Sequence, residues 1–220
     1  SGANALLKRL GYTYKKPRVV PGKADINGQQ KFIKKYRRLR NSMKAKDSLF
    51  FMDGVHPQHN PLVQYGWFKK GVRYPLKTNT QYHRLHINGA IDIDNFDVVI
   101  ESDLSINAET TLNLFEKLRK RRPEGKLYLV LDNAGYYKSK RVQKYAKALG
   151  ITLLYLPPYS PNLNLIERLW GFMQRDILYN RYYPTFEHMK QACFNFFKGL
   201  AQRKSELTSL LTEKFEILPG

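Results

Sequence analysis

The sequence predicts an α/β protein in which helices flank one mixed sheet. Three observations support this class. Strand-like segments gather between residues 48 and 100, helical and strand-like patterns alternate from there to residue 156, and two helical segments close the unit. Strands followed by alternating helix and strand build a layered sheet covered by helices. With 220 residues, the chain is long enough for one such domain and an appendage.

The N-terminal region is predicted to be a basic arm. Residues 3–10 indicate a short helix, and residues 12–24 indicate an extended linker rich in lysine, arginine, proline and glycine. Residues 25–46 have helical periodicity with one apolar face, and six of the ten residues from 31 to 40 are basic. Such a basic run is either a solvated helix face or a contact to the DNA backbone.

The remaining elements follow from hydrophobic alternation and from continuous apolar runs. The predicted strands cover residues 49–53, 65–68, 84–93, 96–100, 127–132 and 151–156. The predicted helices cover residues 108–122, 139–149, 161–180 and 185–202. The third of these helices is expected to take Ser160 as its N-cap and Pro161 as its first residue.

The charge balance points to a polyanionic partner. Lysine and arginine number 38 against 18 acidic residues, which gives a net charge of +20 and a pI near 10. A surplus of this size is most often matched by nucleic acid. The sequence has no basic amphipathic helix, lipidation signal, signal peptide or long apolar run that would favour a membrane, so a cytoplasmic protein is expected. A single cysteine, Cys193, excludes a disulfide framework.

Three carboxylates occupy positions that would bring them together. Asp53 and Asp132 each end an apolar strand, and Glu167 lies in the predicted helix that starts at Pro161. Aspartates at the carboxyl ends of strands reach the rim of a sheet, where open α/β sheets bind ligands. Taken singly, such acids are more often turn caps or solvated side chains. Together in so basic a chain, they predict a divalent-metal site and an enzyme acting on nucleic acid.

Two motifs carry a resemblance to a known family. Asp132-Asn133-Ala134 is followed by Glu167 within Pro-Pro-Tyr-Ser-Pro-x-Leu-Asn-x-Ile-Glu-Arg-Leu-Trp, with 34 residues between the two acids. This pattern resembles the DDE transposases of the mariner superfamily, above all the bacterial insertion-sequence "six-thirty" branch, over roughly residues 12–200. The resemblance implies a mixed sheet of the RNase H-like (retroviral integrase-like) type.

The resemblance also implies an activity. Asp53, Asp132 and Glu167 are then the catalytic residues and the ligands of two Mg²⁺ (or Mn²⁺) ions per active site. The reaction is DNA cleavage at transposon ends followed by strand transfer into target DNA, typically at TA dinucleotides. The implied partners are both DNA substrates and a second copy of the full-length protein, on the nucleoid of a bacterium.

The sequence departs from the family pattern in several places. Tyr137 stands where a histidine is common, and Asn162 and Leu165 stand where aspartate and proline are common. At most the last helix of the usual paired helix–turn–helix units is present, and the chain begins without a methionine, which indicates part of a longer protein. The predicted domains are an N-terminal arm over 1–46, a catalytic domain over 47–205 and a C-terminal tail over 206–220.

Basic residues near these elements are candidate DNA contacts, although each could also be an ordinary solvated charge. They are Lys34, Lys35, Arg37, Arg38, Lys138, Lys140, Arg141 and Arg168. The basic stretch 119–122 is a further candidate surface. Trp67 and Trp170 are expected in the core, since buried tryptophans outnumber base-stacking ones.

Other types of site are weaker. His56 and His59 lack the partners of a zinc site and indicate a loop beside the active site. A tyrosine recombinase would need an arginine and histidine cluster that the sequence does not provide. Two rivals stay open: an RNase H-like nuclease or resolvase without strand transfer, and a catalytically silent DNA-binding protein.

Overall fold

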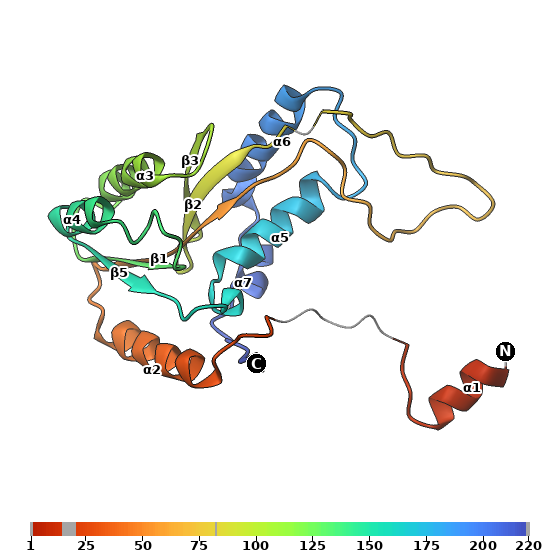
Figure 1. Ribbon diagram of the computed structural model, residues 1–220, viewed down its shortest axis with the longest axis horizontal. Coiled ribbons are helices and arrows are strands. Elements are labelled where there is room, and N and C mark those ends of the chain that lie inside the picture. Colours follow the sequence, from red (N-terminus) through yellow and green to blue (C-terminus); the bar gives the residue numbers. More distant parts are fainter. Residues whose placement is uncertain (1, 15–20, 82, 219–220) are drawn as a thin grey trace.

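A five-stranded mixed sheet forms the centre of the protein. The computed structural model describes residues 2–14, 21–81 and 83–218. The strands are β1 (Ser48–Val55), β2 (His86–Asp92), β3 (Asp97–Asp103), β4 (Leu127–Leu131) and β5 (Ile151–Tyr155), in the order β3-β2-β1-β4-β5. β1, β2 and β3 pair antiparallel, whereas β4 and β5 run parallel to β1 (Figure 1). The predicted α/β class with a mixed sheet is confirmed.

The helices cover both faces of the sheet, and β1 shows why. Leu49 and Phe51 point into one core cluster, and Phe50 and Met52 point into the other. The second cluster is covered by α3 (Ala108–Arg121) and α4 (Lys140–Ala148). The first is covered by α2 (Ile26–Ser42), α5 (Ile166–Ile177), α6 (Phe186–Gly199) and α7 (Lys204–Leu210). A central strand buried on both faces is expected to be apolar, as residues 49–52 are.

The chain segments on either side of the predicted catalytic domain also contribute to its core. Phe32 and Tyr36 of α2 are buried against the sheet, and so are Leu207 and Leu211 at the C-terminal end. Gln29 joins the two segments: its amide donates to the Leu218 carbonyl at 3.1 Å and accepts from the Leu218 amide at 3.1 Å. The domain boundaries at residues 46 and 205 stay a prediction, but both flanking segments pack on the same sheet.

The extreme N-terminal helix is different. α1 (Gly2–Arg9) matches the helix predicted over 3–10, yet it buries no residue and stands apart from the sheet in Figure 1. The predicted linker over 12–24 contains neither helix nor strand where it is described, and its residues 15–20 lie outside the described part of the chain.

The predicted strand over 65–68 is wrong. No strand in the described part of the chain pairs with it, and Tyr65 and Trp67 are 101% and 104% exposed. The segment belongs to a long connection between β1 and β2 that extends away from the sheet, drawn in orange and yellow in Figure 1. Trp67 is therefore not in the core, whereas Trp170 is, at 2% exposed.

The helix predicted to run from Pro161 to about residue 180 is interrupted. A short 3-10 turn, η1 (Pro161–Leu163), is followed by a break at Asn164 and then by α5. The Ser160 hydroxyl donates to the Pro158 carbonyl at 3.1 Å and forms no cap. The backbone is extended at Asn164, and its side chain bonds to the sheet at the Met52 carbonyl.

Two further observations complete the fold. α6 is followed by a second 3-10 turn, η2 (Leu200–Gln202), as expected for a helical segment that ends near residue 202. None of the helices in the described ranges is long and apolar enough to cross a membrane.

Candidate active site

The three predicted acids line one pocket of about 480 Å³. Asp53 lies on β1, Asp132 follows the last residue of β4, and Glu167 lies in the first turn of α5. β1 and β4 are parallel neighbours in the register Phe51 to Val130, and two further residues along each strand place Asp53 beside Asp132. Parallel strands end at the same edge of a sheet, so this pairing follows from the topology.

The connection between β5 and α5 forms the wall of this pocket. Residues 156–161 line it together with Asn133 and Ala134. The Leu156 amide donates to the Leu131 carbonyl at 2.9 Å, and the Asn133 side chain donates to the Leu156 carbonyl at 2.5 Å. Asp132 is held by the Ala134 amide, which donates to its Oδ1 at 3.0 Å. These hydrogen bonds fix the backbone around Asp132 and the wall of the pocket.

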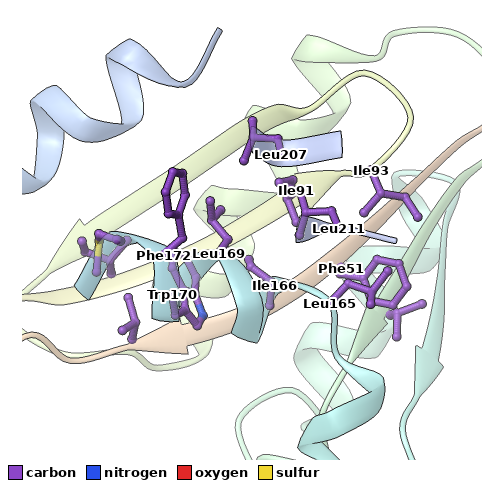
Figure 2. Packing of buried hydrophobic residues seen from close by; sticks show 14 of the residues in the cluster. Phe51, Ile91, Ile93, Leu165, Ile166, Leu169, Trp170, Phe172, Leu207 and Leu211 are labelled. Atoms are coloured by element: carbon purple, nitrogen blue, oxygen red, sulfur yellow. The ribbon is translucent and has the colours of Figure 1, made fainter. Parts of the chain in front are cut away.

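Packing on the sheet fixes the helix that carries Glu167. The apolar residues of α5 belong to the first core cluster, which Ile166, Leu169 and Trp170 share with Phe51 and Ile91 of the sheet (Figure 2). Trp170 occupies the space above Gly89 of β2, and a Cβ at Gly89 would lie 2.6 Å from the Trp170 ring. Only glycine leaves room for this contact. The buried stripe thus leaves Glu167 on the pocket side of the helix.

Crowding of the acids changes their protonation. Burial, followed by the charges of Glu167 and Asp132, raises the pKa of Asp53 to about 8. Loss of water also raises the pKa of Glu167, and the Asp132 charge adds to this. The carboxyl groups of Asp53 and Glu167 interact as hydrogen-bond partners. Without a cation, the pair therefore holds a proton near neutral pH.

The three carboxylates suit divalent cations if each cation is held by two of them. No group of three or more histidine, cysteine, aspartate or glutamate side chains in the described ranges is arranged around a single ion. The three carboxylates nevertheless line the same pocket, and burial together with the charges of Glu167 and Asp132 raises the pKa of Asp53. Mg²⁺ and Mn²⁺ prefer oxygen ligands, and they would neutralise the negative charge of the ionised carboxylates.

The candidate DNA contacts fall into two groups. Lys34, Lys35, Arg37 and Arg38 are exposed on α2, and Lys138 and Lys140 are exposed before and in α4. Arg141 is exposed but forms an ion pair with Glu109 at 2.6 Å. None of these residues lines the pocket.

Arg168 has a structural role that the sequence did not indicate. Its guanidinium donates to the carbonyls of Leu210 (3.1 Å), Thr212 (2.7 Å) and Lys214 (3.1 Å). It therefore holds the C-terminal segment and does not pair with Glu167. More than 40 residues separate these partners along the chain, and no local pattern could have found them.

The basic stretch 119–122 is also engaged within the fold. Arg119 donates to the Leu149 carbonyl at 2.8 Å and to the Gly150 carbonyl at 3.1 Å. Arg121 and Arg122 form ion pairs with Asp97. These arginines tie α3 to β3 and to the end of α4.

The histidines near Asp53 lie outside the pocket. His56 contacts His86 through their Nδ1 atoms at 2.8 Å, and His59 is buried with its Nε2 2.8 Å from the Tyr183 carbonyl. Tyr137, one of the expected departures from the family pattern, is fully buried and donates to the Asn88 side-chain oxygen at 2.8 Å.

Comparison with known proteins identifies the family. The family model described as DDE superfamily endonuclease matches residues 48–190, which include all three acids. The chain belongs to this family. A second model, described as winged helix–turn–helix, matches residues 1–36.

Its relatives agree with the resemblance to mariner and "six-thirty" transposases. The chain is 38% identical to the Tc3 transposase of Caenorhabditis elegans over 91 residues, which are 40% of this chain and 27% of Tc3. It is 26% identical to the insertion element IS630 39 kDa protein of Shigella sonnei over 138 residues, 62% of this chain and 40% of that protein. The matches thus span less than two thirds of these curated relatives.

Solved structures share the fold. The mariner Mos1 paired-end complex with Mg has a TM-score of 0.69 at 17% identity, with 96% of this chain and 70% of that chain covered. The isolated Mos1 catalytic domain has a TM-score of 0.55 at 15% identity, with 92% and 100% covered. The predicted RNase H-like fold is confirmed.

Proposed function

We propose that this DDE family chain is the catalytic part of a transposase. It would hydrolyse phosphodiester bonds at transposon ends and then join the freed 3′-hydroxyl to target DNA. The observation that carries the proposal is the convergence of Asp53, Asp132 and Glu167 from β1, β4 and α5 on one pocket. The named relatives support it, since Tc3 is a transposase and the fold neighbours include the Mos1 Strand Transfer Complex.

The acids would hold two divalent cations, Mg²⁺ or Mn²⁺. Asp53 and Asp132 would hold one ion, and Asp53 and Glu167 would hold the other. Each ion would thus be held by two carboxylates, with Asp53 shared between them. When bound, such ions activate a water or a 3′-hydroxyl and stabilise the leaving oxygen. Fold neighbours solved with Mg and Mn are consistent with this choice.

The protein's own contribution is to hold three carboxyl groups in place around one pocket. Asp53, with a pKa of about 8, must release its proton before it can act as a ligand. The backbone bonds around Asp132 and the packing of Trp170 keep the other acids in place while DNA enters. The same site would serve both steps, because water in the hydrolysis and the 3′-hydroxyl in the joining each attack a DNA phosphodiester.

Positive charge would position the DNA. The net charge of +20 and the exposed basic face of α2 fit contacts to phosphates, which add affinity without sequence preference. The winged helix–turn–helix match over residues 1–36 fits a segment that contacts transposon ends. We further propose a homodimer of the full-length protein on bacterial DNA, and insertion at TA, a step that kinks readily.

A strand-transfer assay tests the function. Full-length protein is given pre-cut ends, a mixed target plasmid and Mg²⁺, and the junctions are sequenced. We expect joined products at TA steps. Cleavage without joining would establish the nuclease or resolvase instead, and binding without metal-dependent nicking would establish a silent DNA-binding protein. Insertions spread evenly over all dinucleotides would contradict the proposed target choice.

A further inference from the structure

Asn164 connects the two segments that carry Asp53 and Glu167. Its side-chain amide donates to the Met52 carbonyl at 3.1 Å, and Met52 directly precedes Asp53. Its backbone carbonyl accepts from the Glu167 amide at 3.1 Å. Asn164 is 3% exposed and lines the acid pocket. One buried residue therefore spans the gap between β1 and α5 at the point where the acids meet.

The amide oxygen of this residue has no partner among the described residues. Because the Met52 carbonyl can only accept a hydrogen bond, the nitrogen of the amide must face it, and Oδ1 must face away. Oδ1 is buried, and no donor in the described part of the chain reaches it. A buried acceptor left in this state costs free energy, so its retention needs a reason.

A cation in the pocket supplies such a reason. Asp53, Asp132 and Glu167 line the same pocket. Once these acids are ionised they can only accept hydrogen bonds, so none of them can donate one to Oδ1. An amide oxygen is a ligand that Mg²⁺ and Ca²⁺ accept, and it also accepts hydrogen bonds from cation-bound water. Outer groups of this kind orient the primary ligands of metal sites.

We propose that Asn164 is a positioning residue of the active site and contributes a fourth oxygen to the divalent-cation pocket. Its amide nitrogen holds β1 at Met52, its backbone holds the start of α5, and its amide oxygen becomes satisfied when the cation and its waters enter. This inference rests on the proposed function for the identity of the cation. It predicts a loss of cation affinity that a merely structural residue would not cause.

The test measures cation binding without DNA. Ca²⁺ and Mg²⁺ are titrated into the chain, and the cation concentration at half-maximal thermal shift is recorded. For Asn164→Ala we expect this midpoint to rise by about 10-fold or more, the range found for outer-shell metal partners. Asn164→Asp, which keeps an oxygen but loses the donor, should recover most of this loss. A midpoint equal to that of the wild type in Asn164→Ala would overturn the proposal.

Asn162 is the matched control. It lies two residues away, its amide donates to Gln29 and to the Glu216 carbonyl, and its Oδ1 is likewise buried with no hydrogen-bond partner in the described ranges. It does not line the pocket. We expect Asn162→Ala to lower the melting temperature without cation and to leave the midpoint unchanged. An equal rise in the midpoint for both variants would make the effect structural and would also overturn the proposal.

Cation titration also separates the two hypotheses. The thermal midpoint needs no DNA substrate, so a wild-type protein that binds cations but joins no DNA would refute the proposed function alone. In an active wild type, Asn164→Ala should lower the maximal joining rate more than the affinity for DNA. The reverse pattern would assign Asn164 to DNA binding and contradict its role beside the acids.

Discussion

Two connections leave the sheet near the acids, and they differ in almost every structural respect. Residues 156–165 after β5 fold back over the strand ends, and Trp170 just beyond them is 2% exposed. In the long connection after β1 (residues 61–81), residues 65–75 are all exposed, and Trp67 is 104% exposed (Figure 1). Both contain prolines, asparagines and tyrosines.

The difference shows that composition does not decide burial in such connections. The short segment finds partners at once, because Leu156 and Asn164 bond to β4 and β1. The long segment carries four lysines and arginines between residues 69 and 77 and no acid, and its strand pairing among the described residues is limited to the bridge between Leu62 and Tyr179. An apolar side chain is buried only where another surface can cover it. Gly89 of β2 provides such a surface for Trp170, whereas Trp67 is fully exposed.

The largest expected effect concerns the acids behind the short connection. Asp53→Asn, Asp132→Asn and Glu167→Gln should each reduce cleavage and joining by full-length protein below detection, because each removes a charged cation ligand. All three should still unfold cooperatively. Asp103→Asn is the control, since Asp103 ends β3 and lies outside the pocket. Near-normal activity in one acid variant would remove that residue from the site.

The two tryptophans give the next largest contrast. Trp170→Ala should lower the free energy of unfolding by about 3–5 kcal/mol, because it leaves a cavity under α5. Trp67→Ala should change it by no more than about 0.5 kcal/mol, as expected for an exposed position. Urea unfolding of both variants measures the difference. Similar losses for the two would mean that the long connection packs against the protein in solution.

The comparison extends to positive charge. Alanine at Lys34, Lys35, Arg37 and Arg38 should weaken binding to all DNA sequences alike. The slope of log K against log salt should become shallower by about 0.9 for each phosphate that the variant no longer neutralises. Arg119→Ala should instead lower stability and leave this slope unchanged, because Arg119 donates to backbone carbonyls. Filter binding across salt concentrations measures both slopes. An unchanged slope in the α2 variant, or a shallower slope in Arg119→Ala, would contradict the prediction.

The smallest effect is a pH dependence of stability. The folded-state pKa of Asp53 is raised to about 8 from an ordinary value near 4, so the folded state binds this proton more tightly than the unfolded state. Its contribution is therefore fully present below about pH 4 and is lost as the pH rises toward 8. Asp53→Asn should melt about 2–4 °C above the wild type at pH 8 and lose this advantage at pH 5.

Cation reverses this trend, which provides the check. Mg²⁺ or Mn²⁺ should raise the melting temperature of the wild type most strongly at pH 8, where Asp53 gives up its proton readily, and should not raise that of Asp53→Asn. A difference between the two proteins that stays constant from pH 5 to pH 9 would contradict the raised pKa.

Local patterns in the chain were enough to predict most of the sheet, its helices and the three acids. The apolar run before Asp53 and the one before Asp132 predict strands that carry these acids to the sheet rim. These features are local, since side-chain periodicity depends on a few neighbouring residues. The positions of the acids at strand ends already predicted that they meet, the DDE motifs supported this through resemblance, and the three acids line one pocket in the structure.

Contacts between distant segments give similar residues different roles, and no sequence pattern predicted them. Arg168 holds the C-terminal segment, Trp67 is exposed, and Asn164 interrupts a predicted helix to bind the strand that carries Asp53. Each outcome depends on a partner distant in sequence or on the lack of a covering surface nearby. Hydrogen bonds and burial are properties of pairs of surfaces, and a pattern along one segment cannot specify the surface that the fold places opposite it.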